Sequence, residues 1–191
     1  MSNAKNRDVI DEAVKFLRDY YHAEGRDIQS AHAHAAVSHY LGYKSKAALK
    51  SDPSFDPTDV DLLNYRETGI EKLVECISRM KPTPLQDVSP SHLGEVIHAG
   101  LAPACESCNH KSMDITPLGY EEREPEGWVC RDCATMYEDD YATCRYCGED
   151  YIYRASEINE RGECHEHDGE SVYDEEEEDD IDSLIEYYQN H

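Results

Sequence analysis

Seven of the eight cysteines in this chain of 191 residues fall between positions 105 and 164, and their spacing is typical of metal ligands. Three pairs have the spacing Cys-x2-Cys, and the last cysteine has the same spacing to a histidine: Cys105–Cys108, Cys130–Cys133, Cys144–Cys147 and Cys164–His167. Two intervening residues let a tight turn direct both ligand atoms at one ion, with each sulfur about 2.3 Å from zinc. Four such pairs supply the ligands of two tetrahedral ions. The pattern therefore predicts two structural zinc sites.

The four pairs can be divided between two ions in two ways. In the sequential arrangement the first two pairs hold one ion and the last two hold the other. The interleaved arrangement joins the first pair to the third and the second to the fourth, as in cross-brace domains. We favour the sequential arrangement, because each loop between paired ligands then spans a hairpin. Met113 and Ile115 fit one strand and residues 127–129 lead back to the second pair, while residues 151–153 and a turn at 157–162 fit a second hairpin.

The eighth ligand is expected to be His167, and His165 and His110 are neighbouring alternatives. A catalytic zinc normally has three protein ligands and an open position for water, whereas the four pairs fill both shells. The chain also lacks His-Glu-x-x-His and the combined pattern of zinc deaminases, His-x-Glu before Pro-Cys-x-x-Cys. We therefore expect no enzymatic activity. Cys76 stands apart from the pairs and is expected to be a small core side chain.

Two segments resemble known modules. Residues 127–133, Gly-Trp-Val-Cys-Arg-Asp-Cys, look like the second knuckle of a zinc ribbon, and residues 144–148, followed by 157–164, are similar to small bacterial zinc-ribbon modules. The resemblance implies a metal-binding fold without a particular activity, and His167 departs from its all-cysteine form. Residues 30–49 resemble a helical module near the N-termini of some bacterial plasmid- and phage-borne proteins, and a related pattern occurs in proteins associated with glyoxalase-like domains. This second resemblance suggests a bacterial origin.

The first hundred residues contain the apolar periodicity of helices. Apolar side chains at i, i+3, i+4 and i+7, together with capping and breaking residues, predict helices over these ranges: 7–24, 30–41, 66–80 and 90–100, the last ending at Gly100. Ser45 is expected to cap a further short helix, so residues 30–50 outline a candidate helix-turn-helix. Residues 81–89 contain two prolines, Pro82 and Pro84, and are expected to form a linker.

Charge divides the chain unevenly. Residues 1–100 carry 12 Lys and Arg against 15 Asp and Glu, whereas residues 101–191 carry 6 against 27, which accounts for most of the formal net charge of −24. Because nucleic-acid binding depends on neutralising phosphates with basic side chains, residues 101–191 are poorly suited to it. The polar N-terminus and the lack of a long apolar stretch indicate no signal peptide and no membrane span. We therefore expect a cytoplasmic protein in which paired cysteines bind metal rather than form disulfides.

The C-terminal end combines two patterns. Residues 174–180 are seven consecutive acidic residues, which are expected to repel one another and to be disordered. Ile181, Leu184, Ile185 and Tyr188 follow at the spacing of one helical face. Such a helix would either pack back on this protein or bind a partner, and the sequence leaves both open.

Together these features predict a small α+β protein. Residues 1–100 would form a helical domain, residues 101–170 two zinc-ribbon-like β modules, and residues 171–191 an acidic tail with a short amphipathic helix. The function expected is that of a non-catalytic, zinc-binding adaptor or regulator that binds a protein, with a basic partner suited to the acidic half. The alternatives are a DNA-binding regulator that uses the helical domain and an acidic mimic of nucleic acid.

Overall fold

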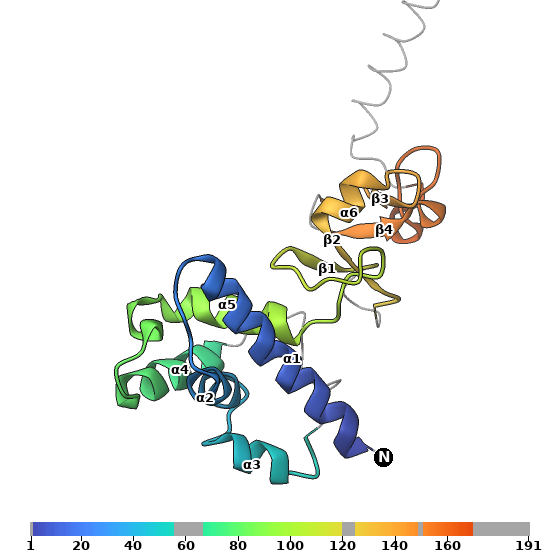
Figure 1. The fold of residues 1–191 in the computed structure, drawn as a ribbon. Helices are drawn as coiled ribbons and strands as arrows, with labels where there is room; N and C mark the ends of the chain where they lie inside the picture. The colour runs from blue at the N-terminus through green and yellow to red at the C-terminus, as the bar shows by residue number, and fades with distance from the viewer. Residues whose placement is uncertain (1, 56–66, 120–124, 149–150, 170–191) are drawn as a thin grey trace, which may run out of the picture.

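The computed structural model describes residues 2–55, 67–119, 125–148 and 151–169. The chain forms a helical lobe and a smaller lobe with two short antiparallel sheets (Figure 1). This is the small α+β architecture that the sequence predicts. The expected acidic tail at residues 171–191 lies outside the described residues. No helix in the described ranges combines the length and the hydropathy that crossing a membrane requires.

The helical lobe contains five α-helices and one 3-10 turn within the described residues. They are α1 (Ser2–Ala23), α2 (Ser30–Tyr40), α3 (Lys46–Ser51), α4 (Glu67–Arg79), η2 (Pro84–Asp87) and α5 (Pro90–Leu101). The predicted ranges therefore agree with the structure to within a few residues, except at the start of α1. The Ser45 hydroxyl caps α3 by accepting a hydrogen bond of 3.1 Å from the backbone N–H of Ala48.

The predicted apolar stripe of α1 forms one side of the core. Ile10, Val14, Leu17 and Tyr21 are each at most 4% exposed. Leu73 of α4 and Leu93 of α5 are both fully buried in the same cluster. Burying large apolar side chains from several helices supplies the main stabilising free energy of this lobe.

Gly100 is the penultimate residue of α5, so the predicted end of this helix agrees with the structure to within one residue. A Cβ at this position would stand 3.0 Å from the Cα atom and 3.1 Å from the carbonyl oxygen of Ala13 in α1. The glycine therefore permits α1 and α5 to approach backbone to backbone. The helix continues to Leu101, whose side chain is buried.

The segment expected as a linker, residues 81–89, contains the turn η2 and packs against the helices. Leu85 is fully buried in the helical core, and the Thr83 hydroxyl accepts a hydrogen bond of 3.4 Å from the Leu85 N–H. This segment is thus part of the helical lobe.

The smaller lobe contains two antiparallel strand pairs and a short helix. Its elements are β1 (Ile115–Pro117), β2 (Trp128–Cys130), α6 (Arg131–Met136), β3 (Tyr141–Thr143), β4 (Ile152–Arg154), and the 3-10 turns η3 (Ala155–Glu157) and η4 (His165–His167). β1 pairs with β2, with Ile115 opposite Cys130, and β3 pairs with β4, with Tyr141 opposite Arg154.

The second hairpin differs from the sequence prediction. β4 pairs with β3, which precedes the third ligand pair, whereas the returning segment makes only the isolated bridge between Ile158 and Cys164. Tyr141 and Ile152 both bury their side chains in the core beside the first two ligand pairs. Burial against that core favours the pairing of β3 with β4.

The two strand pairs are joined to each other. Leu118, directly after β1, forms a parallel bridge with Ile152 of β4, and the Gly119 N–H donates a hydrogen bond of 2.9 Å to the Ile152 carbonyl. Leu118 is 2% exposed and packs with Val129 and Ile152. These contacts hold the two halves of the smaller lobe together.

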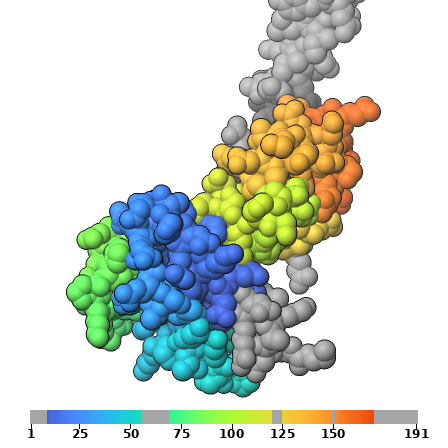
Figure 2. All heavy atoms as spheres, in the orientation of Figure 1, coloured from blue at the N-terminus to red at the C-terminus, as the bar shows by residue number. Residues whose placement is uncertain are grey.

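Lys111 connects the two lobes. Its ammonium donates hydrogen bonds of 2.8 Å to the Gly100 carbonyl and 2.6 Å to the Ala102 carbonyl, at the C-terminal end of α5. It also lies 3.5 Å from a carboxylate oxygen of Glu12 in α1. A cation at a helix C-terminus is favoured by the helix dipole. In Figure 2 the blue surface of the N-terminal helix meets the yellow-green surface of the smaller lobe near this point.

Candidate metal centres

Four cysteine side chains converge where the first two ligand pairs meet. Cys105, Cys108, Cys130 and Cys133 place their sulfur atoms within 4.8 Å of one another. The first pair lies on a turn after α5, in which the Asn109 N–H donates to the Cys105 carbonyl and Asn109 itself has a positive φ of 58°. Asparagine tolerates this left-handed conformation better than most residues. The second pair lies at the end of β2 and in the first turn of α6.

The second group likewise consists of four converging ligands, one of which is a histidine. Cys144, Cys147, Cys164 and His167 also place one ligand atom each within 4.8 Å of one another. Gly148, directly after the third pair, has a φ of +91°, a conformation that glycine adopts without strain. The imidazole Nδ1 atom of His167 lies 3.3 Å from the Cys147 and Cys164 sulfurs and 3.7 Å from the Cys144 sulfur.

The separations within both groups fit a shared metal ion and exclude disulfides. The Cys108 and Cys130 sulfurs are 3.9 Å apart, and the Cys147 and Cys164 sulfurs are 3.7 Å apart. A disulfide needs about 2.05 Å. In a tetrahedron with zinc–sulfur bonds of about 2.3 Å, the sulfurs are about 3.8 Å apart. All eight cysteines of the chain are free thiols. The chain therefore contains two groups that could hold metal ions, each drawn from ligand pairs that are consecutive in the sequence.

The alternative eighth ligands lie elsewhere. His165 is exposed, with its Nδ1 atom 3.2 Å from a carboxylate oxygen of Glu166, and the backbone carbonyl of His110 accepts a hydrogen bond from the Cys105 N–H. Within the described residues, only His167 among these three histidines belongs to a ligand group. Cys76 belongs to neither group; it is 6% exposed, and burial raises the pKa of its thiol to about 11.

Backbone N–H groups lower the pKa of one cysteine thiol in each group. Burial opposes ionisation of Cys105, but N–H groups of Cys108, Cys130 and Ser107 outweigh it and lower the pKa of the thiol to about 6. Burial likewise opposes ionisation of Cys144, and N–H groups of Cys164, Tyr146 and Cys147 lower its pKa to about 6. Metal binding requires thiolates, so these turns favour the metal-binding form.

Three other thiols of these groups, those of Cys130, Cys133 and Cys147, resist ionisation in the absence of a cation because their pKa values are raised. Burial and the neighbouring sulfurs raise the pKa of Cys133, and burial together with the neighbouring thiols raises the pKa of Cys147 to about 12. Crowded thiolates repel one another, and a divalent cation removes that repulsion. Sulfur-rich, four-ligand groups of this kind suit zinc, and a bound ion would supply folding free energy by linking two segments of chain.

Tyr153 supports the second group without belonging to it. Its side chain is 4% exposed, and its hydroxyl lies 3.0 Å from the Cys147 sulfur. A hydroxyl that donates to a metal-bound thiolate orients the ligand and reduces its charge. The sequence predicts only that Tyr153 lies in a strand, because the partner of its hydroxyl depends on how β4 packs.

Glu106 connects the two groups. Its carboxylate accepts hydrogen bonds of 2.9 and 3.1 Å from the two terminal nitrogens of Arg154 and one of 2.8 Å from the Tyr141 hydroxyl. Glu106 lies between the ligands of the first group, whereas Arg154 and Tyr141 lie on the strands that support the second. A side chain at Gly127 would have to displace the Glu106 carboxylate from its position in this ion pair.

This bidentate ion pair is expected to contribute about 1 kcal/mol to the stability of the metal-loaded chain. A double-mutant cycle with Glu106→Gln and Arg154→Met, measured by chemical denaturation, should give that coupling energy. The Arg154 guanidinium, followed by the Tyr141 hydroxyl, lowers the pKa of Glu106. The carboxylate therefore stays ionised in the folded state below its unfolded pKa, and the coupling should persist from neutral pH to about pH 5 and disappear in stronger acid.

The matched control pairs Glu106→Gln with Arg145→Met, because Arg145 is exposed and its guanidinium lies over the Tyr146 ring. That cycle should give no coupling. A coupling near zero for Arg154 as well would contradict the assigned role of the ion pair.

Comparisons of the chain with protein-family models, curated proteins and solved structures give no match.

Proposed function

We propose that this protein is a non-catalytic, zinc-binding adaptor or regulator whose smaller lobe binds another protein. The observation that carries the proposal is the closed composition of both ligand groups. Each group offers four protein ligands, which satisfies a tetrahedral ion and leaves no position for substrate or water. The two modules are then zinc-ribbon-like knuckles whose ions maintain shape, and function depends on the surface that this shape presents.

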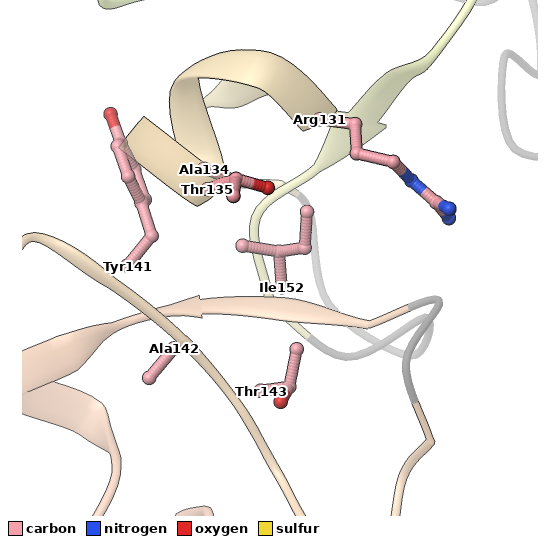
Figure 3. A pocket seen from close by; sticks show the side chains of 7 residues that line it. All are labelled: Arg131, Ala134, Thr135, Tyr141, Ala142, Thr143 and Ile152. Carbon is pink, nitrogen blue, oxygen red and sulfur yellow. The ribbon is translucent and has the colours of Figure 1, made fainter. Parts of the chain in front are cut away.

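An apolar surface of the smaller lobe is suited to a partner. Met136, at the end of α6, is 72% exposed, and Tyr137 is 44% exposed. They directly follow the residues of α6 that line a cleft of about 380 Å³ against β3 and β4. Figure 3 shows this cleft, with Ile152 directed between α6 and the strands. Exposed large apolar side chains beside a cleft mark interaction sites more often than isolated ones do.

The charge around this surface indicates the kind of partner. Glu138, Asp139 and Asp140 follow Tyr137 directly, and residues 101–191 carry 27 acidic side chains against 6 basic ones. Such a surface attracts a basic protein segment and repels nucleic acid. We propose a partner that places an apolar side chain in the cleft and lysine or arginine beside the acidic residues.

Affinity purification with the full chain tests the proposal. Met136→Asp should abolish recovery of the partner, because it replaces the most exposed large apolar side chain of this surface with a charge. Val74→Asp is the matched control, since Val74 is an exposed apolar side chain, 49% accessible, on the helical lobe. The proteins that only Met136→Asp loses should be rich in lysine and arginine, and their recovery should fall as salt exceeds about 0.15 M. Equal losses for both variants, or partners that are acidic and insensitive to salt, would contradict it.

DNA binding by the helical lobe has less support. α3 has only six residues, its Leu49 is buried, and the Lys46 ammonium lies 3.4 Å from a carboxylate oxygen of Asp11. A recognition helix would instead present such side chains to a groove of DNA. A gel shift with the full chain separates this alternative from the proposal.

A further inference from the structure

A groove runs between α2 and α4 on the helical lobe, away from both ligand groups. It has a volume of about 560 Å³ and is lined from α2 and its following turn by Ala35, His39, Gly42, Tyr43 and Lys44, and from α4 and the next residue by Lys72, Glu75, Cys76, Arg79 and Met80. Small residues line the groove on both sides, Ala35 and Gly42 on one and Cys76 on the other. Most of its accessible lining is apolar.

The rim of this groove is basic in a strongly acidic protein. The chain has 18 Lys and Arg against 42 Asp and Glu, yet the lining contains Lys44, Lys72 and Arg79 and one acidic residue, Glu75. Arg79 is paired with Glu75 at 2.6 Å. Among the described residues, Lys44 and Lys72 lie within ion-pair distance of no carboxylate, and both are exposed. Within the part of the chain that the structure describes, the rim therefore presents two exposed lysines without an ion-pair partner beside an apolar floor.

One segment of the same chain has the complementary pattern. At helical spacing Ile181, Leu184, Ile185 and Tyr188 share one face, and Asp182 and Glu186, four residues apart, lie together on one side of it. The apolar face matches the groove floor, and the two carboxylates match the basic rim. Length agrees too, because residues 181–188 as a helix and the groove wall from Lys72 to Met80 both extend about 10–12 Å at 1.5 Å per residue.

The length of the connection limits where the segment can dock. Eleven residues lie between the last described residue, Gly169, and Ile181, so an extended chain spans up to about 40 Å over these twelve steps. Docking within the same chain therefore requires the groove between α2 and α4 to lie within this span of Gly169.

We propose that residues 181–188 dock in the groove between α2 and α4 of the same chain, with their apolar face on Cys76 and Met80 and their carboxylates beside Lys44 and Lys72. The sequence alone left open whether this segment packs back or binds a partner. The groove supplies an intramolecular receptor, and it does so independently of the function proposed for the smaller lobe.

Photo-crosslinking in the full, metal-loaded chain tests this docking. Tyr188 is replaced by the photoreactive aromatic residue p-benzoylphenylalanine, and the crosslinked sites are mapped by mass spectrometry. Crosslinks should concentrate in residues 35–44 and 72–80. Lys72→Glu should lower their yield about fivefold, as expected for reversing one exposed charge contact worth about 1 kcal/mol. Adding Asp182→Lys to Lys72→Glu should restore much of the yield by exchanging the two charges.

Lys15→Glu is the matched control, because Lys15 is an exposed lysine of α1 outside the groove. It should leave the yield unchanged, and circular dichroism should show that both lysine variants retain their helices. Crosslinks placed mainly on the smaller lobe, equal effects of the two lysine variants, or crosslinks that form only between chains and rise with protein concentration would each overturn the proposal.

Discussion

Removing the metal ions from the full chain should unfold the smaller lobe and leave the helical lobe folded. The buried side chains around the two ligand groups form two small clusters, in which most members are the cysteines themselves or their immediate neighbours. Domains with so little apolar core depend on metal for their folding free energy. The helical lobe instead has a large apolar cluster contributed by α1, α2, α4 and α5. The two lobes therefore differ in what stabilises them.

Hydrogen exchange measured by mass spectrometry during chelation checks this expectation. Amides in β1, β2, β3 and β4 should lose protection, those in α1 and α5 should keep it, and added zinc should restore the first set. Cys76→Ser should behave as the unchanged protein, since this cysteine is buried in the helical lobe outside both groups. Protection of the four strands that survives complete chelation would contradict the structural role of the metal.

A core substitution in the helical lobe should destabilise that lobe and leave the metal content of the smaller lobe unchanged. Leu73 is fully buried in the cluster that joins α4 to α1 and α5. Leu73→Ala should destabilise this lobe by about 2–5 kcal/mol, because it removes buried apolar surface and leaves a cavity. Metal content should not change, because both ligand groups found among the described residues lie in the smaller lobe. Circular dichroism during denaturation and metal analysis of the same sample provide the two measurements.

Val74→Ala is the neighbouring control for this change. Val74 is 49% exposed, so its truncation should alter the free energy of unfolding by no more than about 0.5 kcal/mol. If Leu73→Ala also released metal, the two lobes would be one cooperative unit, and the division of stability between core and metal would be wrong.

Features with a local signature could be predicted from the sequence. The ligand pairs have a fixed spacing of two residues, and the stripe of Ile10, Val14, Leu17 and Tyr21 repeats within a single helix. Both patterns depend only on neighbouring residues, so no knowledge of tertiary packing was needed to place the candidate ligands or the main helices.

The features that the sequence does not predict depend on contacts between distant segments. The sequence predicts Gly100 as the end of a helix but not its close approach to the backbone of Ala13. The pairing of β3 with β4 depends on burial of Tyr141 and Ile152 in a core built by other residues. The spacing of residues along the sequence holds no information about the contact between Gly100 and Ala13 or about the pairing of β3 with β4.

The positioning residues escaped prediction for the same reason. Glu106 and Arg154 are 48 positions apart and looked like ordinary charged residues in an acidic region. Nothing in the sequence around Lys111 indicates that its ammonium donates a hydrogen bond to a carbonyl at the C-terminal end of α5. For both Arg154 and Lys111, the only clue in the sequence is a basic residue within an otherwise acidic segment.

The most direct test of the two metal centres is native mass spectrometry of the chain purified without added zinc, compared with the double variant Cys105→Ser/Cys130→Ser. The unchanged chain should carry two zinc ions. The double variant should keep one, because both substitutions fall in the same ligand group, whereas interleaved groups would lose both. Two ions falling to one would establish the sequential centres. Fewer than two ions in the unchanged chain, or none in the double variant, would contradict them.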